Sequence, residues 1–396
     1  MPADYLHATP LPILSLTTHL AYWDRSMNVS HWISERSKAV EISGIRKVFE
    51  LARSLKSPVN LSIGQPHFDV PESIKMAAKV AIDSNKNGYT LTQGIPELRE
   101  RLLADVRNTF AHPDRDLLIT SGTSGGLMLA ILATVNPGDE VVAADPYFVM
   151  YPNMVALAGG TFVGVDTTPG FGIDPDQFIA ACTPKTKMIL LCSPSNPTGT
   201  IVAPEAMQRI TEFARRRGIL VVSDEIYKAF HYDGPPRSPA EFDDSVLVIE
   251  GFGKTYGMTG WRLGFAHGPK ALVDEMMKLQ QSTFVCAPSI VQYAGLAACD
   301  YDVTGIVADY KRKRDLLVAG LTGHYEFAVP GGAFYLYPKA PWGTGTEFVT
   351  AAVQRNLLMI PGAVFSARDT HFRISYAASD ETLQRGIEIL QAMAKR

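Results

Sequence analysis

Five continuous apolar runs, separated by helical patterns, constrain the fold of this chain more than any other feature. The runs are DEVVAA (139–144), TFVGV (161–165), KMILLC (187–192), GILVVS (218–223) and SVLVIE (245–250). Apolar runs without polar alternation are typical of parallel strands that are buried on both faces. The helical pattern between two of them, 204–217, has a proline at its start and a glycine directly after it, as expected for a helix. The sequence therefore predicts an α/β architecture with a mostly parallel sheet covered by helices.

The C-terminal part of the chain follows a different pattern. We expect a long helix at about 304–322, the segment GGAFYLYP (331–338), a helix at 346–356, a strand at 372–377 and a final helix from about 380. This order favours a smaller α+β domain. The predicted organisation is an N-terminal extension (1–32), a large domain (61–287) and a discontinuous small domain (33–60 and 288–396). The extension lacks a basic leading segment and a clear cleavage site, which argues against a signal peptide, and Met27 is an alternative start.

Charge and hydropathy exclude several classes of protein. The chain is 46% hydrophobic and 19% charged, a balance typical of a globular enzyme and not of a disordered protein. Its net charge of −3 offers no basic field for nucleic acid. No apolar stretch reaches the roughly 18 residues that a membrane helix needs. The four cysteines are scattered and have no metal-ligand spacing, so we expect reduced thiols, no metal site and a cytoplasmic protein.

A lysine stands in an unusual setting within GFGKTYGMTGWRLGF (251–265). Lys254 lies among glycines and aromatic residues just after an apolar run, and Arg262 follows eight residues later. Burial disfavours the charged form of a lysine and so lowers its pKa. A neutral lysine is a nucleophile that forms Schiff bases with carbonyl compounds. An arginine suits a phosphate or a carboxylate.

Polar residues also follow two of the other predicted strands, where ligands gather in α/β sheets. Asp224 comes directly after the run 218–223, where a carboxylate is costly without a cationic partner. Tyr227 would face the same way in a helical turn. Asn196 precedes a proline in SPSNPTGT (193–200), and such a bond can be cis. A helix N-cap or structural ion pair remains the alternative for Asp224, and a plain turn for 193–200.

A Gly/Ser/Thr turn opens an apolar helix in ITSGTSGGLMLAILATVNPGDEV (119–141). Backbone N–H groups and the positive helix end at such a turn bind phosphate. The turn is neither a Walker A motif nor a dinucleotide fingerprint, and helix capping by Ser121 or Thr123 is the alternative. A phosphate turn, a nucleophilic lysine, a buried aspartate and a phenol together indicate pyridoxal 5′-phosphate. Its phosphate, aldehyde, ring nitrogen and phenolic oxygen need these four partners.

The motifs SPSNPTG, SDEIY, GKTYGMTGWRLG and FRISYA resemble those of class I/II aminotransferases, which are fold-type-I pyridoxal phosphate enzymes. They occur in the order and approximate spacing of that family, and the similarity runs from about residue 33 to the end. The resemblance implies that Lys254 forms the Schiff base, that Asp224 pairs with the pyridine nitrogen and that Arg373 binds the substrate α-carboxylate. It further implies O3′ contacts from Tyr227 and Asn196, a phosphate cradle of Thr123, Ser124 and Arg262, ring stacking by Phe148, and substrate contacts from Gly64 and Asn196.

Tyr89 matches a tyrosine that reaches the phosphate of the neighbouring subunit, so the resemblance implies a homodimer with shared active sites. Two positions depart from the family pattern, since Gly251 and Gly253 stand where many members have serine. The phosphate would lose a hydroxyl donor at Gly251, which other contacts or water can replace. Ser43, in EISGIRK (41–47), is expected near the substrate side chain.

The resemblance implies an aminotransferase that works by a ping-pong mechanism. Aspartate is the first candidate donor, with alanine and aromatic amino acids as alternatives, and 2-oxoglutarate is the expected acceptor. A C–S lyase or another lyase on the same fold is the alternative enzyme class, because fold does not fix reaction. A pyridoxal phosphate-binding transcription regulator would need a DNA-binding domain, for which the leading residues are too few.

Overall fold

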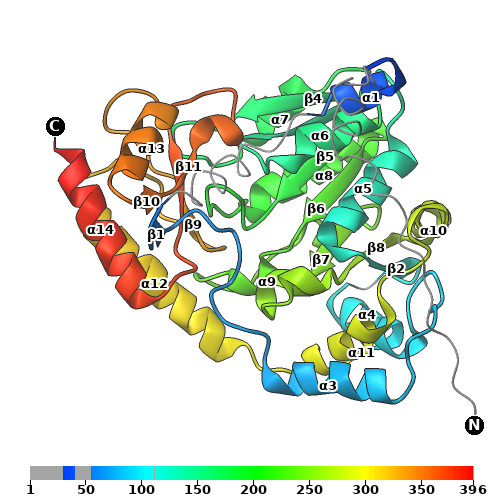
Figure 1. Ribbon diagram of the computed structural model, residues 1–396. Helices are drawn as coiled ribbons and strands as arrows, with labels where there is room; N and C mark the ends of the chain where they lie inside the picture. The colour runs from blue at the N-terminus through cyan, green and yellow to red at the C-terminus, as the bar shows by residue number, and fades with distance from the viewer. Residues whose placement is uncertain (1–29, 41–54, 111, 396) are drawn as a thin grey trace, which may run out of the picture.

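The computed structural model describes residues 30–40, 55–110 and 112–395. Two parts lie side by side (Figure 1). The larger part is built around a twisted sheet, and the smaller part contains the C-terminal helices. Within the described ranges, no helix is long and apolar enough to cross a membrane. The four cysteines are all free.

A seven-stranded sheet forms the centre of the larger part, in the order β2-β8-β7-β6-β5-β3-β4. Pairing is parallel from β4 through to β7, and β8 is antiparallel to both of its neighbours. The strands are β2 (Arg115–Thr120), β3 (Glu140–Asp145), β4 (Thr161–Asp166), β5 (Thr186–Cys192), β6 (Leu220–Asp224), β7 (Leu247–Gly251) and β8 (Gly264–Pro269). The five apolar runs correspond to β3, β4, β5, β6 and β7. The predicted mostly parallel sheet is therefore confirmed.

Both faces of this sheet are buried, which explains the continuous apolar runs. In β5, Ile189 and Leu191 pack into one core, while Met188 and Leu190 pack into another. The first core includes residues of α3 (Glu72–Asp83), α4 (Pro96–Thr109), α7 (Pro175–Ala181), α8 (Pro204–Arg217) and α11 (Ser289–Ala298). The second includes residues of α5 (Gly122–Thr134), α6 (Met150–Leu157) and α10 (Lys270–Thr283). The apolar side chains of each strand thus contribute to both cores in turn.

The smaller part has its own core. It contains the antiparallel sheet β11-β12-β9 and the parallel pair β1-β10. Its elements are β1 (Val59–Asn60), α12 (Thr304–Leu321), β9 (Tyr335–Leu336), α13 (Gly345–Gln354), β10 (Leu357–Leu358), β11 (Ile360–Pro361), β12 (Phe372–Ser375) and α14 (Asp380–Ala394). The predicted C-terminal helices and strand are therefore confirmed, with ends shifted by a few residues.

Because β1 pairs with β10, segments far apart in the sequence build the smaller part together. The domain boundaries 1–32, 33–60, 61–287 and 288–396 stay a prediction, and most of 1–32 and part of 33–60 lie outside the described residues. The remaining short elements are η2 (Ser30–Trp32), α1 (Glu35–Lys38), η3 (Lys228–Phe230), η4 (Pro239–Glu241), α9 (Phe252–Thr255), η5 (Thr259–Trp261) and η6 (Gly362–Val364).

Candidate active site

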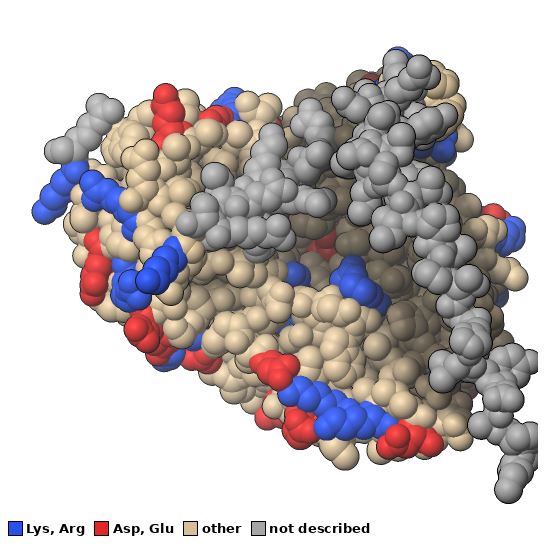
Figure 2. Space-filling model, in the orientation of Figure 1, with Lys and Arg blue, Asp and Glu red and all other residues tan. Residues whose placement is uncertain are grey.

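A cavity of about 280 Å³ lies at the carboxyl ends of β5, β6 and β7, between the two parts of the molecule. This face is hollowed, and basic side chains are visible inside the hollow (Figure 2). Ten of the predicted site residues line the cavity: Gly64, Thr123, Ser124, Phe148, Asn196, Asp224, Tyr227, Lys254, Arg262 and Arg373. Tyr89 is the predicted residue that does not line it. Side chains that are far apart in the sequence thus converge as the α/β topology predicts.

Lys254 lies on the one-turn helix α9, directly after β7. Its Nζ donates a hydrogen bond of 2.5 Å to the backbone carbonyl of Gly64. Burial lowers the pKa of Lys254 to about 8, and the positive charges of Arg373 and Arg262 act in the same direction. A substantial fraction of this amine is therefore neutral, and so nucleophilic, in mildly alkaline solution.

Asp224 is the last residue of β6 and is 3% exposed. Tyr151, on α6, donates a hydrogen bond of 2.7 Å to its Oδ2. Burial raises the pKa of Asp224 to about 6, although the Tyr151 bond and nearby Lys254 act against the rise. A carboxylate in this state favours a cationic or N–H partner. Tyr151 was missed by the sequence analysis, although it follows Phe148 by about one helical turn and so could be expected on the same face.

The end of the cavity formed by the start of α5 and Arg262 suits an anion. Helix α5 begins at Gly122, whose φ of +68° is in the left-handed region. A Cβ at Gly122 would lie 2.7 Å from Nη2 of Arg262, so glycine leaves the room that the guanidinium fills. The side chain of Ser121 makes no capping hydrogen bond to α5, which disfavours that alternative. The N–H groups at the start of α5 and a guanidinium therefore face one region.

Gly251 is explained by packing. A Cβ at this position would lie 2.9 Å from the methyl carbon of Thr123 and 3.1 Å from Cδ1 of Ile226. A serine would therefore require these neighbours to shift. At Gly253, by contrast, the nearest atom would be 3.5 Å away, an ordinary contact distance.

Arg373, on β12, is buried at the end of the cavity formed by the smaller part. Its Nη1 donates to Oδ1 of Asn196 and its Nη2 donates to the carbonyl of Ser62, both at 2.9 Å. Its Cζ lies 4.5 Å from the ring centre of Tyr335. No described residue accepts a hydrogen bond from the buried Nε. Since each Nη carries two protons, the guanidinium retains donors for a further acceptor.

Tyr335 and Ser62 were also missed by the sequence analysis. The hydroxyl of Tyr335 lies 2.8 Å from that of Tyr227, and its ring packs against the guanidinium of Arg373. Tyr335 therefore contacts two predicted site residues. Ser62 contributes a backbone carbonyl, for which a sequence carries no specific signal. The Asn196–Pro197 bond is cis.

Tyr89 is the predicted site residue that the structure does not bring to the cavity of this protomer. Tyr89 is 88% exposed, so its expected phosphate contact requires a neighbouring subunit and stays a prediction. Ser43 lies outside the described residues. In the part of the chain that the structure describes, no group of three or more His, Cys, Asp or Glu could bind a metal ion.

A second cavity, of about 300 Å³, is lined by residues of α4 and by residues at or just after the ends of β6 and β7. Its charged lining includes Glu225, Lys228 and Glu250. Nζ of Lys228 lies 3.3 Å from Glu225 and 3.2 Å from Glu250. These charges satisfy one another, and none of the predicted site residues lines this cavity, so it is not the candidate site.

The residues of the 280 Å³ cavity fit the expected cofactor on structural grounds. The glycine-lined end beside Arg262 suits a phosphate. The buried carboxylate of Asp224 suits a ring N–H, and the amine of Lys254, with its lowered pKa, suits an aldehyde. Phe148 supplies an aromatic wall.

Comparison with known proteins agrees with this arrangement. A family model described as "Aminotransferase class I and II" matches residues 56–390. A Methanocaldococcus jannaschii protein named "Probable aspartate aminotransferase" is 36% identical over 372 residues, which cover 91% of this chain and 99% of the relative. The aspartate/prephenate aminotransferase of Thermus thermophilus is 37% identical over 361 residues, which cover 86% of this chain and 92% of the relative. The solved structure of Thermus thermophilus aspartate aminotransferase with maleate superposes with a TM-score of 0.87 at 34% identity, covering 91% of this chain and 99% of that one.

Proposed function

The chain belongs to the class I and II aminotransferase family and is an aminotransferase, and from this premise we propose its cofactor, substrates and residue roles. The cofactor is pyridoxal 5′-phosphate. The enzyme moves the amino group of an L-amino acid to a 2-oxo acid by a ping-pong mechanism. Aspartate is the first candidate donor, which the names of the relatives support, and 2-oxoglutarate is the proposed acceptor.

One observation carries the proposal: Lys254, Asp224 and Arg373 line the same cavity. Lys254 supplies an amine with a lowered pKa, and Asp224 supplies a buried carboxylate. Arg373 supplies a buried guanidinium with unused N–H donors. Together they suit capture of a carbonyl, stabilisation of a ring N–H and recognition of a carboxylate.

The residues that would hold the cofactor are divided between two ends of the cavity. Thr123, Ser124 and Arg262 would bind the phosphate. Asp224 would accept a hydrogen bond from the ring nitrogen, and Tyr227 and Asn196 would bind the phenolic oxygen. Phe148 would stack on the ring. Lys254 would bind the aldehyde carbon covalently. When bound, pyridoxal phosphate supplies an electron-withdrawing ring that weakens the bonds at the substrate α-carbon.

The side chains of the protein then have separate tasks. Arg373 would orient the substrate by holding its α-carboxylate with two parallel N–H groups. Lys254 Nζ would take the α-proton and return it, because its pKa of about 8 suits proton transfer near neutral pH. Asp224 would keep the proton on the ring nitrogen, since a buried carboxylate favours a positive partner.

We also propose a homodimer with shared active sites. Tyr89 is exposed in this protomer and lies outside its own cavity, which supports a role in the cavity of a neighbour. A location in the cytoplasm stays a prediction.

A panel of amino donors tests the proposed function. Aspartate, alanine, phenylalanine and tyrosine should each be incubated with 2-oxoglutarate and the holoenzyme. Aspartate is expected to give glutamate and oxaloacetate in equal amounts. If no donor gives glutamate, the proposal is wrong. A cysteine S-conjugate is tested in the same way, and release of a thiol, pyruvate and ammonia from it without an acceptor would instead identify a C–S lyase.

A further inference from the structure

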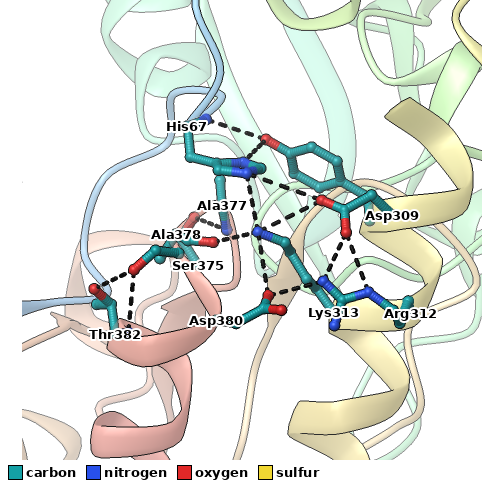
Figure 3. Close-up of polar contacts among 11 residues, drawn as sticks. His67, Asp309, Arg312, Lys313, Ser375, Ala377, Ala378, Asp380 and Thr382 are labelled. Carbon is teal, nitrogen blue, oxygen red and sulfur yellow. Dashed lines mark hydrogen bonds and ion pairs between the residues drawn. The ribbon is translucent and has the colours of Figure 1, made fainter. Parts of the chain in front are cut away.

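A buried lysine lies outside the cavity, where α12 meets the segment 62–68 and the start of α14 (Figure 3). The side chain of Lys313 is 3% exposed. Its Nζ donates to the carbonyl of Ala378 at 2.5 Å and to Nε2 of His67 at 2.9 Å. A buried ammonium is costly unless its protons find acceptors. The position of Lys313 therefore depends on both partners.

Each partner of Lys313 lies on a segment that also builds the candidate active site. His67 comes three residues after Gly64, the residue whose carbonyl accepts from Lys254. Ala378 comes five residues after Arg373. Lys313 thus ties together the segments that carry the lysine contact and the carboxylate-binding arginine.

The same two segments are joined closer to the cavity. The backbone N–H of Ser375 donates to the carbonyl of Leu61 at 2.8 Å. Arg373 donates to the carbonyl of Ser62 at 2.9 Å. The contacts of Lys313 with His67 and Ala378 join the same two stretches of chain farther from the cavity, and we call them the outer bonds. Loss of the outer bonds would loosen residues 64–68 relative to Arg373, while the inner bonds at Leu61 and Ser62 remain.

The hydrogen bonds define the protonation state of His67. An ammonium can only donate, so Nε2 of His67 accepts from Lys313. Nδ1 lies 3.0 Å from the hydroxyl of Tyr310, and the backbone N–H of His67 donates to the same hydroxyl at 3.2 Å. In this arrangement the imidazole is neutral and carries its proton on Nδ1.

We propose that Lys313 and His67 form a positioning pair that sets the affinity of the cavity for substrate carboxylates, and that the pair is intact only while His67 is neutral. The inference rests on the proposed function, because the pair acts through Arg373 and the segment that contains Gly64. Neither member of the pair lines the cavity. They are positioning residues and not catalytic ones.

The charges around His67 make the pair sensitive to pH. Burial and Lys313 lower its pKa, while Asp309 and Asp380 act in the opposite direction. Asp309 Oδ2 lies 3.9 Å from Nε2, and Asp380 Oδ1 lies 3.6 Å from Nζ of Lys313. Both carboxylates also bind Arg312, at 2.7 and 2.8 Å, so part of their charge is already engaged.

The direction of the pH effect follows from these contacts. The pKa of His67 lies below the ordinary value, so the imidazole stays neutral at neutral pH. As the pH falls through this lowered pKa, Nε2 gains a proton that points at the ammonium of Lys313. The hydrogen bond of 2.9 Å between Nζ and Nε2 is then lost. The two positive groups repel each other, and the pair separates. The KM values for amino donor and 2-oxoglutarate should therefore rise together on the acid side.

The experiment compares His67→Gln and His67→Leu with the wild-type holoenzyme. Glutamine offers an oxygen that accepts from Lys313 at every pH, whereas leucine offers none. We measure KM and kcat from pH ~5 to ~9, across the range in which histidine titrates. Calorimetry also measures the binding of 2-oxoglutarate to the holoenzyme without an amino donor. His67→Leu should raise KM and weaken binding by about tenfold at neutral pH, because a small misplacement weakens an oriented contact.

His67→Gln should keep the KM of the wild type at neutral pH and lose the acid-side rise. Lys313→Met should behave like His67→Leu, and Lys313→Arg should recover part of the affinity. Matched controls are Lys311→Met on the same helix and His112→Gln, whose imidazole pairs with Asp244. Both controls should keep the KM and pH profile of the wild type.

The outcomes separate this inference from the proposed function. Turnover by the wild type tests the function, whereas the difference between variants and wild type tests the pair. The wild type can be active while the folded Lys313→Met and His67→Leu variants bind 2-oxoglutarate as tightly as the wild type does. That result would overturn the proposed pair and leave the proposed function intact. If the leucine variant does not fold, the glutamine variant still decides: an acid-side rise in KM as large as that of the wild type contradicts the proposal.

Discussion

The phenol of Tyr151 donates a hydrogen bond of 2.7 Å to Oδ2 of Asp224, and both side chains are buried. The bond links α6 to the end of β6 and limits rotation of the carboxylate. Asp224 also lines the cavity. A carboxylate held in this way is oriented before a ligand arrives, which reduces the entropic cost of binding.

Asp224→Asn is expected to keep the cofactor and lose most of the activity. The amide has nearly the same shape, but it has no negative charge to keep a proton on the ring nitrogen. The loss should be at least ~2 kcal/mol of transition-state stabilisation, or roughly 30-fold in kcat/KM. Steady-state kinetics and absorption spectra of the same preparation provide the measurement. A variant whose kcat/KM stays within about threefold of the wild-type value would refute the role of Asp224 in keeping the ring nitrogen protonated.

Tyr151→Phe is the matched control for that change. It removes one hydrogen bond to the carboxylate and leaves the charge in place. We expect a smaller loss than for Asp224→Asn, because the carboxylate keeps the negative charge that would hold the proton on the ring nitrogen. Equal losses in the two variants would indicate that orientation, and not charge, is the property that matters.

The holoenzyme is expected to be yellow, and borohydride should bleach it and fix the cofactor to Lys254. Burial lowers the pKa of this lysine to about 8, so its amine is available. Lys228 offers an internal comparison, because the neighbouring carboxylates of Glu250 and Glu225 raise its pKa despite burial. Peptide mass spectrometry should find the reduced adduct on Lys254 and not on Lys228. An adduct on any other lysine would contradict the assignment.

Gly251→Ser is expected to destabilise the protein by about 1–3 kcal/mol, because overpacking forces neighbours to move. The new Cβ would lie 2.9 Å from the methyl carbon of Thr123. Gly253→Ser is the matched control, since its Cβ would meet its nearest neighbour at 3.5 Å. Thermal and denaturant unfolding of the two variants should therefore differ. If both are equally stable, packing does not explain the glycine at position 251.

The parts of the fold and site that depend on local chemistry and periodicity could be predicted from the sequence. The five apolar runs predicted β3 to β7 because strands buried on both faces need continuous apolar residues. Lys254 and Asp224 stood out because charged groups beside such strands require a reason. Ser62 gave no signal, since its contribution is a backbone carbonyl. Tyr335 and Lys313 gave none either, because their roles depend on which distant segments the fold brings beside them.

Chains carrying Lys254→Ala and Tyr89→Phe should complement each other if the active sites are shared. In a mixed dimer, one site would combine an intact Lys254 with an intact Tyr89 from the other chain. Activity after mixing and reassembly should therefore exceed the sum of the separate preparations. Activity equal to that sum would place both residues in the same protomer's site. A fully active monomer at the assay concentration would remove the proposed homodimer.

Arg373→Lys is expected to weaken all amino donors and 2-oxo acid acceptors alike while leaving the cofactor colour intact. Arg373 donates to Asn196 and Ser62 and still has unused N–H groups. Lysine offers a point charge that cannot keep both contacts and also grip a carboxylate with two parallel donors. The cost should be ~2–4 kcal/mol in kcat/KM, or roughly 30- to 1,000-fold. Amines that lack a carboxylate should be little affected, which makes them the control substrates. If the variant discriminated against aspartate while sparing alanine, Arg373 would recognise the substrate side chain, and the proposed orientation of the substrate would be reversed.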